Sequence, residues 1–294
     1  MQSDKSMRPT HLLAAFVVVF LWGMNFVPMK VAVSEIPPIF LTGLRMAATA
    51  AILIGFVSPP RGHYRRVAML SLVMGTTHYG LIYSGIAEVD VAVTAIVIQL
   101  GVPFSAILAL VMLNDRFGWR RTLGLIVAFG GVVVLAGEPQ TASSLPHLLM
   151  IVAAAFFWAL ANVLIKGLSE VPTFTVVCYM AVFATPQLFL LSFFLEEGQW
   201  TAMVEAGWIV YASLAYMVLA TSVFSYFVWY RLLTLYPVSN VVPVTLLAPV
   251  IGGISGIILL DELLTWEKIV GGALTIGGVA VIQLRWRNVA AARN

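Results

Sequence analysis

The sequence consists largely of apolar segments that are each long enough to cross a bilayer, and this feature limits the chain to one broad class. A membrane-spanning helix needs about 20 mainly apolar residues. Only 10% of the 294 residues are charged, whereas soluble domains average about 25%. We therefore predict an all-α membrane protein with ten transmembrane helices. The predicted spans cover approximately residues 11–33, 38–57, 66–87, 91–113, 120–137, 147–167, 173–195, 207–231, 238–260 and 267–285.

The lysines and arginines predict which way these spans run, because cytoplasmic loops carry an excess of both. With the N-terminus in the cytoplasm, most of the sixteen basic residues fall in inward segments. They are Lys5, Arg8, Arg61, Arg65, Arg66, Arg116, Arg120, Arg121, Lys166, Arg231, Arg285, Arg287 and Arg293. Acidic residues such as Glu35, Asp90 and Glu262 fall in the opposite loops. We expect both termini in the cytoplasm and a retained first span, because its apolar run exceeds the roughly 7–15 residues of a signal peptide's apolar region.

A tryptophan, an asparagine and a lysine recur together in two of the spans. The lysine follows the tryptophan by eight residues in both, and the two sets are Trp22, Asn25, Lys30 and Trp158, Asn162, Lys166. Residues three or four apart share a helix face, so in each set the tryptophan and the asparagine lie together. We expect both faces to line a central cavity. The alternative is helix packing with interhelical hydrogen bonds, worth roughly 0.6–2 kcal/mol each.

The two halves of the chain correspond beyond these sets. A shift of 147 residues places Asp115 on Glu262 and Trp119 on Trp266, and it superposes the glycines that follow. Pro103 and Pro249 also correspond within one residue of that shift. Five spans per half is an odd number, so the second half must enter the membrane from the opposite side. We predict two inverted five-helix repeats, residues 1–137 and 138–294, an arrangement typical of secondary transporters with a site between the repeats.

Paired repeats with these motifs in this order resemble the EamA-type drug/metabolite transporter family, and within it the bacterial YddG-type exporters of amino acids, especially aromatic ones. The resemblance runs from about Leu12 to Leu284. It implies a multi-pass protein of the bacterial inner membrane that exports small zwitterionic metabolites, foremost amino acids, by alternating access. The family's usual glutamate before the fifth span is Asp115 here.

Polar and aromatic residues inside the spans are the candidates for the cavity, because a buried polar group in a bilayer needs a partner or water. Ser222 and Ser225 lie in the eighth span, and the neighbouring Trp229 is expected to be an interfacial belt residue. The predicted cavity lies between spans one, three, four, six, eight and nine, with hinges at Pro103 and Pro249. Its candidate residues are Trp22, Asn25, His78, Tyr79, Tyr83, Gln99, Trp158, Asn162, Ser222, Ser225 and Thr245.

Two cations inside the spans need explanations of their own, since a charge at the bilayer centre costs about 2.5–3.5 kcal/mol on insertion scales. Lys30 lies near the outer end of its span, where it can snorkel to the headgroups; contact with a substrate carboxylate is the second option. Arg45 lies deeper, and an inward-facing role is left open. No aspartate or glutamate falls inside a span, which leaves His78 as the one group that titrates near neutral pH at mid-depth. We therefore expect facilitated export with weak or no proton coupling.

The glycine pairs Gly130-Gly131, Gly271-Gly272 and Gly277-Gly278 permit close helix approach. The fifth and tenth spans are therefore expected to form scaffold or a homodimer contact, outside the transport pathway.

Three other functions are alternatives to amino acid export. Gly253-Ile-Ser255-Gly256, with His78 as base, matches the pattern of an intramembrane serine protease, but glycine-rich spans produce such matches easily, so we expect no enzyme. Cationic or aromatic drugs, and nucleotide-sugar-like metabolites, are the alternative substrates. The chain contains no phosphate-binding loop or zinc-protease motif, so no cofactor, metal or nucleic acid is expected; the partners are a small molecule and the lipid bilayer.

Overall fold

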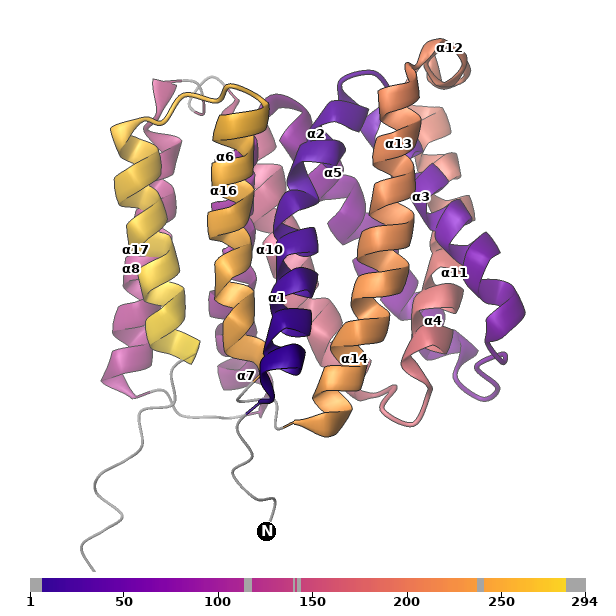
Figure 1. Ribbon diagram of the computed structural model, residues 1–294, viewed down its shortest axis with the longest axis horizontal. Coiled ribbons are helices and arrows are strands. Elements are labelled where there is room, and N and C mark those ends of the chain that lie inside the picture. Colours follow the sequence, from indigo (N-terminus) through magenta and orange to yellow (C-terminus); the bar gives the residue numbers. More distant parts are fainter. Residues whose placement is uncertain (1–6, 114–117, 140, 142–143, 237–240, 284–294) are drawn as a thin grey trace, which may run out of the picture.

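The computed structural model describes residues 7–113, 118–139, 141, 144–236 and 241–283, and within these every regular element is helical. Most helices run along one common direction (Figure 1), with α8 and α17 at one edge of the bundle and α3 and α11 at the other. The elements before residue 137 are α1 (Pro9–Met24), α2 (Phe26–Val33), α3 (Pro38–Leu53), η1 (Ile54–Phe56), α4 (Tyr64–Leu70), η2 (Ser71–His78), α5 (Tyr79–Glu88), α6 (Val91–Val97), η3 (Ile98–Leu100), α7 (Gly101–Leu113) and α8 (Trp119–Ala136). Those after it are α10 (Leu145–Lys166), α11 (Thr173–Leu195), α12 (Gln199–Glu205), α13 (Trp208–Tyr216), η4 (Met217–Phe224), α14 (Ser225–Leu235), η5 (Val242–Leu246), α16 (Leu247–Leu259) and α17 (Trp266–Gln283).

Six helical stretches of the described chain are long and apolar enough to cross a membrane. They are Pro9–Val33, Pro38–Phe56, Val91–Leu108, Leu145–Lys166, Thr173–Leu195 and Trp208–Leu233. Two shorter apolar helices cover Thr122–Ala136 and Val244–Leu259. The predicted spans 66–87 and 267–285 are not among these; the first contains a polar run through His78, and the second begins with Glu267 and Lys268. The multi-pass helical class is confirmed, and the count of ten spans stays a prediction.

Helix contacts between the halves are paired. Helix α3 packs on α11, α6 on α16, and α8 on α17. Helix α1 contacts α14 and α16, and α10 contacts α5 and α7, which are the elements at the corresponding positions of the other half. When α6 and α7 are taken together as the fourth predicted span and α16 as the ninth, this set of contacts is unchanged by exchanging the halves.

The glycines of α8 and α17 face each other within the chain. A Cβ added at Gly131 would lie 2.5 Å from the carbonyl oxygen of Gly271, and one at Gly278 would lie 2.6 Å from that of Gly124. The 147-residue shift takes Gly124 to Gly271 and Gly131 to Gly278, so the two contacts are counterparts. The glycines immediately before these, Gly130 and Gly277, have nothing within 4 Å of an added Cβ. They therefore lie on the outer face of the α8–α17 helix pair.

Two segments of the bundle are π-helical, and they occupy the same position in the two halves. Segment η2 covers Ser71–His78 and η4 covers Met217–Phe224, ranges separated by 146 residues at both ends. The same offset relates Pro103 to Pro249, and the first residue of α7, Gly101, to that of α16, Leu247. π-Helical turns are rare and are frequent at functional sites, so this pair directs attention to the interior beside it.

Candidate functional site

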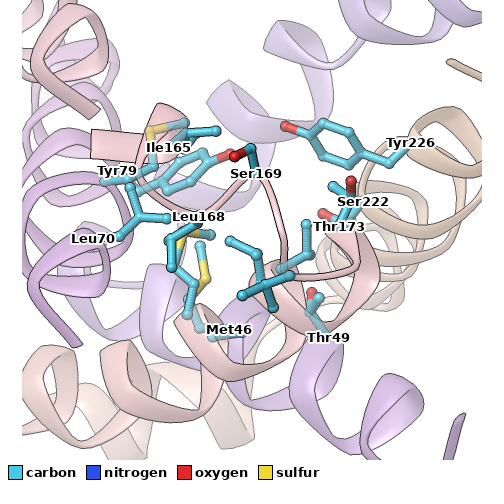
Figure 2. A pocket seen from close by; sticks show the side chains of 16 residues that line it. Met46, Thr49, Leu70, Tyr79, Ile165, Leu168, Ser169, Thr173, Ser222 and Tyr226 are labelled. Carbon is cyan, nitrogen blue, oxygen red and sulfur yellow. The ribbon is translucent and has the colours of Figure 1, made fainter. Parts of the chain in front are cut away.

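A cavity of about 190 Å³ lies in the interior, bordered by elements of both halves. Figure 2 shows Tyr79, Ser222 and Tyr226 on its wall, together with the segment around Ser169 that joins α10 to α11. The wall is largely apolar and contains no charged side chain. Its residues are Met46, Thr49, Leu70, Met74, Tyr79, Ile165, Leu168, Ser169, Val171, Thr173, Val176, Val177, Met180, Ala181, Ser222 and Tyr226.

The walls of this cavity differ from the predicted ones. The second and seventh predicted spans, α3 and α11, supply much of the lining, and the first, fourth and ninth supply none of it. Of the predicted residues, Tyr79 and Ser222 line this cavity. The methionines Met46, Met74 and Met180 on the wall were not predicted, because an apolar cavity wall has the same composition as a lipid-facing surface.

Arg45 lies directly behind the wall and gathers several of the predicted residues. Its side chain is buried, at 4% exposure. The Nη1 group donates to the hydroxyl of Tyr83 at 2.7 Å, and Nη2 donates to the hydroxyls of Ser222 at 3.0 Å and Thr221 at 3.3 Å. The guanidinium carbon lies 5.2 Å from the centre of the Tyr79 ring. Arg45 therefore faces the interior of the bundle, the orientation that the sequence left open.

Asn25 and Trp22 lie on the η4 and α14 side of this cluster. The side-chain oxygen of Asn25 accepts from the Thr221 hydroxyl at 3.3 Å, where the first span breaks between α1 and α2. The Trp22 ring packs against Tyr226 at 5.8 Å and Trp229 at 5.1 Å between centroids. Trp229 is 8% exposed, so it is a packing residue here, and its prediction as an interfacial belt residue is wrong.

His78 and Tyr79 point to different neighbours, as adjacent helical residues must. The His78 Nδ1–H donates to the carbonyl oxygen of Ala154 at 2.8 Å and the ring is buried, while Tyr79 reaches the cavity. The hydroxyl of Ser255 donates to the carbonyl of Gly252 in its own helix. His78 and Ser255 thus form no nucleophile–base pair within the described residues.

Gln99 and Thr245 both lie in short 3₁₀ segments, η3 and η5, that interrupt the fourth and ninth predicted spans. A proline lacks an N–H and clashes with the carbonyl four residues earlier. For Pro103 and Pro249 these carbonyls belong to Gln99 and Thr245, which explains why both helices tighten there. Both prolines are buried and both amide or hydroxyl side chains are half-buried.

The remaining candidates lie in α10, α14 and α2. Trp158 packs on Gly101, whose added Cβ would lie 2.5 Å from the indole ring, and Asn162 is half-buried one turn later. The hydroxyl of Ser225 is fully buried and donates to the Ala220 carbonyl at 2.7 Å. The ammonium of Lys30 donates to the carbonyls of Ile86, Ala87 and Val89 at 2.8–3.1 Å. Lys30 thus binds the C-terminal end of α5, and the prediction that its side chain snorkels to the lipid headgroups is wrong.

A polar side chain from the opposite half contacts each π-helical segment. Arg45 of α3 donates to Ser222 in η4. Gln187 of α11 accepts from the hydroxyl of Thr76 in η2 at 2.7 Å and donates to that of Ser71 at 3.0 Å. Thr76 and Ser222 are counterparts at the 146-residue offset. Gln187 was missed, although a single amide in the apolar segment 173–195 was visible in the sequence.

The end of the bundle away from the N-terminus is held by carboxylates that accept from helix N-termini. Glu196 accepts from the backbone N–H groups of Ile39 and Phe40 at 2.7 and 2.9 Å, and Glu262 accepts from those of Val91 and Ala92 at 2.5 and 3.0 Å. Burial raises the pKa of the Glu262 carboxyl, and the two N–H groups oppose that shift. Its predicted counterpart Asp115 lies outside the described residues. Each of these contacts joins the second half to the first at this end of the bundle.

The described residues contain no group of three or more His, Cys, Asp or Glu side chains that could hold a metal ion.

Comparison with known proteins identifies relatives over nearly the whole chain. The model of a family described as the EamA-like transporter family matches residues 10–137 and again residues 145–284. A probable amino-acid metabolite efflux pump of Escherichia coli (strain K12) is 29% identical over 284 residues, covering 93% of this chain and 95% of the relative. A protein of the same description from Salmonella typhimurium (strain LT2) is 28% identical and covers 91% and 92%. A solved crystal structure shares the fold, with a TM-score of 0.64 at 18% identity, covering 94% of this chain and 96% of that one.

Proposed function

The chain belongs to the EamA-like transporter family, and from this membership we propose that it exports small zwitterionic metabolites, foremost amino acids, across the bacterial inner membrane. The observation that carries the proposal is the apolar cavity between the halves, with a few hydroxyls on its wall. Ligand sites are typically apolar hollows with a small number of placed polar groups. Two relatives that are described as probable amino-acid metabolite efflux pumps support the same substrate class.

The cavity's size favours a small solute over a drug. Sites for drug-sized ligands measure about 300–1,000 Å³, whereas a dry cavity of about 150 Å³ holds one benzene molecule. A volume of about 190 Å³ lies much nearer the second figure. An amino acid with an apolar side chain fits this space and wall better than a multi-ring drug or a nucleotide sugar.

The proposed mechanism is alternating access between two inverted five-helix repeats, residues 1–137 and 138–294. Three observations support this arrangement: the helix contacts are unchanged when the halves are exchanged, the glycine contacts of α8 and α17 are counterparts, and one family model matches each half. Helix α1 begins at the end of the bundle where α10 finishes, as inversion requires.

In the proposed cycle the far end opens while the N-terminal end closes. The start of α4, the segment before it and the end of α10 lie at the same end of the bundle as the start of α1 (Figure 1), and they contain basic residues that include Arg61, Arg65 and Lys166. This supports placing that end in the cytoplasm. The cavity reaches the α10–α11 segment at this same end. The interrupted helices at η2, η3, η4 and η5 lie at four related positions where the backbone can bend. The solute would enter from the cytoplasm and leave after the carboxylate contacts of the far end separate.

The test is export by purified protein in liposomes across a panel of amino acids, with two tryptophan substitutions on one helix. Val177→Trp fills the cavity from α11, and Leu190→Trp lies on the same helix with a 61% exposed native side chain. We expect Val177→Trp to abolish export at normal expression and folding, and Leu190→Trp to retain it. Equal export by both variants would remove this cavity from the transport pathway, and export of drugs alone would favour the alternative substrate class.

A further inference from the structure

Arg45 is a buried cation without an anionic partner. Its three hydrogen-bond partners, Tyr83, Ser222 and Thr221, are all neutral hydroxyls. No carboxylate among the described residues lies within ion-pair distance of it, and its buried Nε has no hydrogen-bond partner. Buried charges in proteins are normally paired with an opposite charge. An uncompensated guanidinium at this depth is therefore a place where an anion would be stabilised.

The guanidinium is also next to the cavity. It contacts Tyr79 and Ser222, both of which line the wall, and Met46 and Thr49 of the wall lie within one turn of Arg45 on α3. The sixteen lining side chains are neutral. Arg45 thus gives an otherwise uncharged cavity a positive potential on the side of Ser222.

We propose that Arg45 is the receptor for a substrate carboxylate in this cavity. The inference rests on the proposed export function and narrows it to solutes with a free carboxylate and an apolar side chain. A guanidinium binds a carboxylate through two parallel N–H groups. The unpartnered Nε–H supplies one of these, and Nη2 supplies the other once the carboxylate replaces the Ser222 hydroxyl. The apolar side chain then lies against Met46, Met74 and Met180.

The same charge excludes other solutes. A cationic amine without a carboxylate brings a like charge towards Arg45 and leaves Nε unpaired. An amide of the same side chain offers a single weaker acceptor. Since a hydrogen bond to a charged group is stronger than a neutral one, loss of the carboxylate should weaken binding by about ten- to a hundredfold. Cationic drugs should be poor substrates for the same reason.

The wild-type protein alone can test this. Export of radiolabelled L-leucine from proteoliposomes is measured against competition by 4-methyl-2-oxopentanoate, L-leucinamide and 3-methylbutylamine, which keep the side chain and differ in the carboxylate or the amine. We expect the oxo acid to compete, and the amide and the amine to compete about tenfold less or not at all. If the amide and the amine compete as well as the oxo acid while leucine is still exported, the inference is overturned and the proposed function stands. Absence of export for every amino acid in the panel overturns both.

Substitutions separate a receptor from a structural role. Arg45→Lys keeps the charge without the two-pronged geometry, and Arg45→Gln removes the charge. If Arg45 binds the carboxylate, both variants should bring competition by leucinamide closer to competition by unlabelled leucine, so that the ratio of the two approaches one. The change should be larger for Arg45→Gln. A merely structural residue predicts equal loss for both solutes with the ratio unchanged, which would also overturn the inference. The exposed Arg65→Gln variant is the matched control and should keep the wild-type ratio.

Discussion

The close contact between α8 and α17 gives a pair of adjacent substitutions with opposite expected effects. Gly131→Ala places a Cβ 2.5 Å from the Gly271 carbonyl oxygen, whereas ordinary contacts begin at 3.4 Å. The obstructing atoms include backbone, so α8 and α17 must separate by roughly 1 Å, and overpacking of this kind costs about 1–3 kcal/mol. Gly130→Ala meets nothing within 4 Å and gains up to about 1 kcal/mol in helix propensity. Gly131→Ala has the same gain in helix propensity, so the two variants should differ in stability by the overpacking cost alone, about 1–3 kcal/mol.

The chain contains its own reporter for this measurement. Cys178 is the one cysteine and is fully buried in α11, so a fluorogenic maleimide reacts only as detergent-solubilised protein unfolds on heating. We expect Gly131→Ala to lower the midpoint of thiol exposure, and Gly130→Ala to leave it unchanged or raise it. The counterpart pair, Gly278→Ala and Gly277→Ala, should repeat the pattern. Equal midpoints within either pair would refute the close approach of α8 and α17.

Three further predictions concern the helix ends, the energy source and the oligomer. Glu196→Gln weakens both hydrogen bonds to the start of α3 and should lower stability by about 1 kcal/mol, measured as a lower thermal midpoint. The control Glu197→Gln, at the exposed neighbouring residue, should leave the midpoint unchanged, and equal shifts for the two variants would contradict the assignment. Export should be unaffected when a pH gradient is collapsed, because His78 is tied to a backbone carbonyl; uphill accumulation driven by a proton gradient alone would contradict this. If a homodimer forms through the outer glycines, Gly130→Trp combined with Gly277→Trp should halve the particle mass in light scattering, and an unchanged dimer would exclude that face.

The helices and the correspondence between halves could be predicted because both are recorded in local patterns. Apolar runs of sufficient length are helices in a bilayer, and the spacing of Pro103, Pro249 and the paired glycines survives in both halves. The interruptions at Gln99 and Thr245 follow from proline chemistry four residues later. These features depend on neighbours along the chain, so one sequence contains them.

The cavity wall depends on contacts between distant segments, and those could not be derived. Val177 and Met180 line the cavity while Leu190, on the same helix, is exposed, yet nothing in their composition distinguishes them. Lys30 was expected at the headgroups because its contact with the α5 carbonyls depends on the tertiary fold and cannot be seen in the sequence. The π-helical segments leave no trace in residue type either, since their side chains are those of an ordinary apolar helix.

Each π-helical segment fits one residue more into a turn than an α-helix does, and so acts as a one-residue insertion inside a continuous helix. An α-helical residue turns the chain by about 100°, so everything beyond the insertion is rotated by that amount relative to an uninterrupted helix. Tyr79 follows η2 directly and owes its direction to it. When relatives of this chain are aligned, site residues therefore correspond only where the insertion is shared. In a homologue that lacks it, the residue written beneath Tyr79 would face a neighbouring helix, and specificity inferred from that column would be assigned to the wrong side chain.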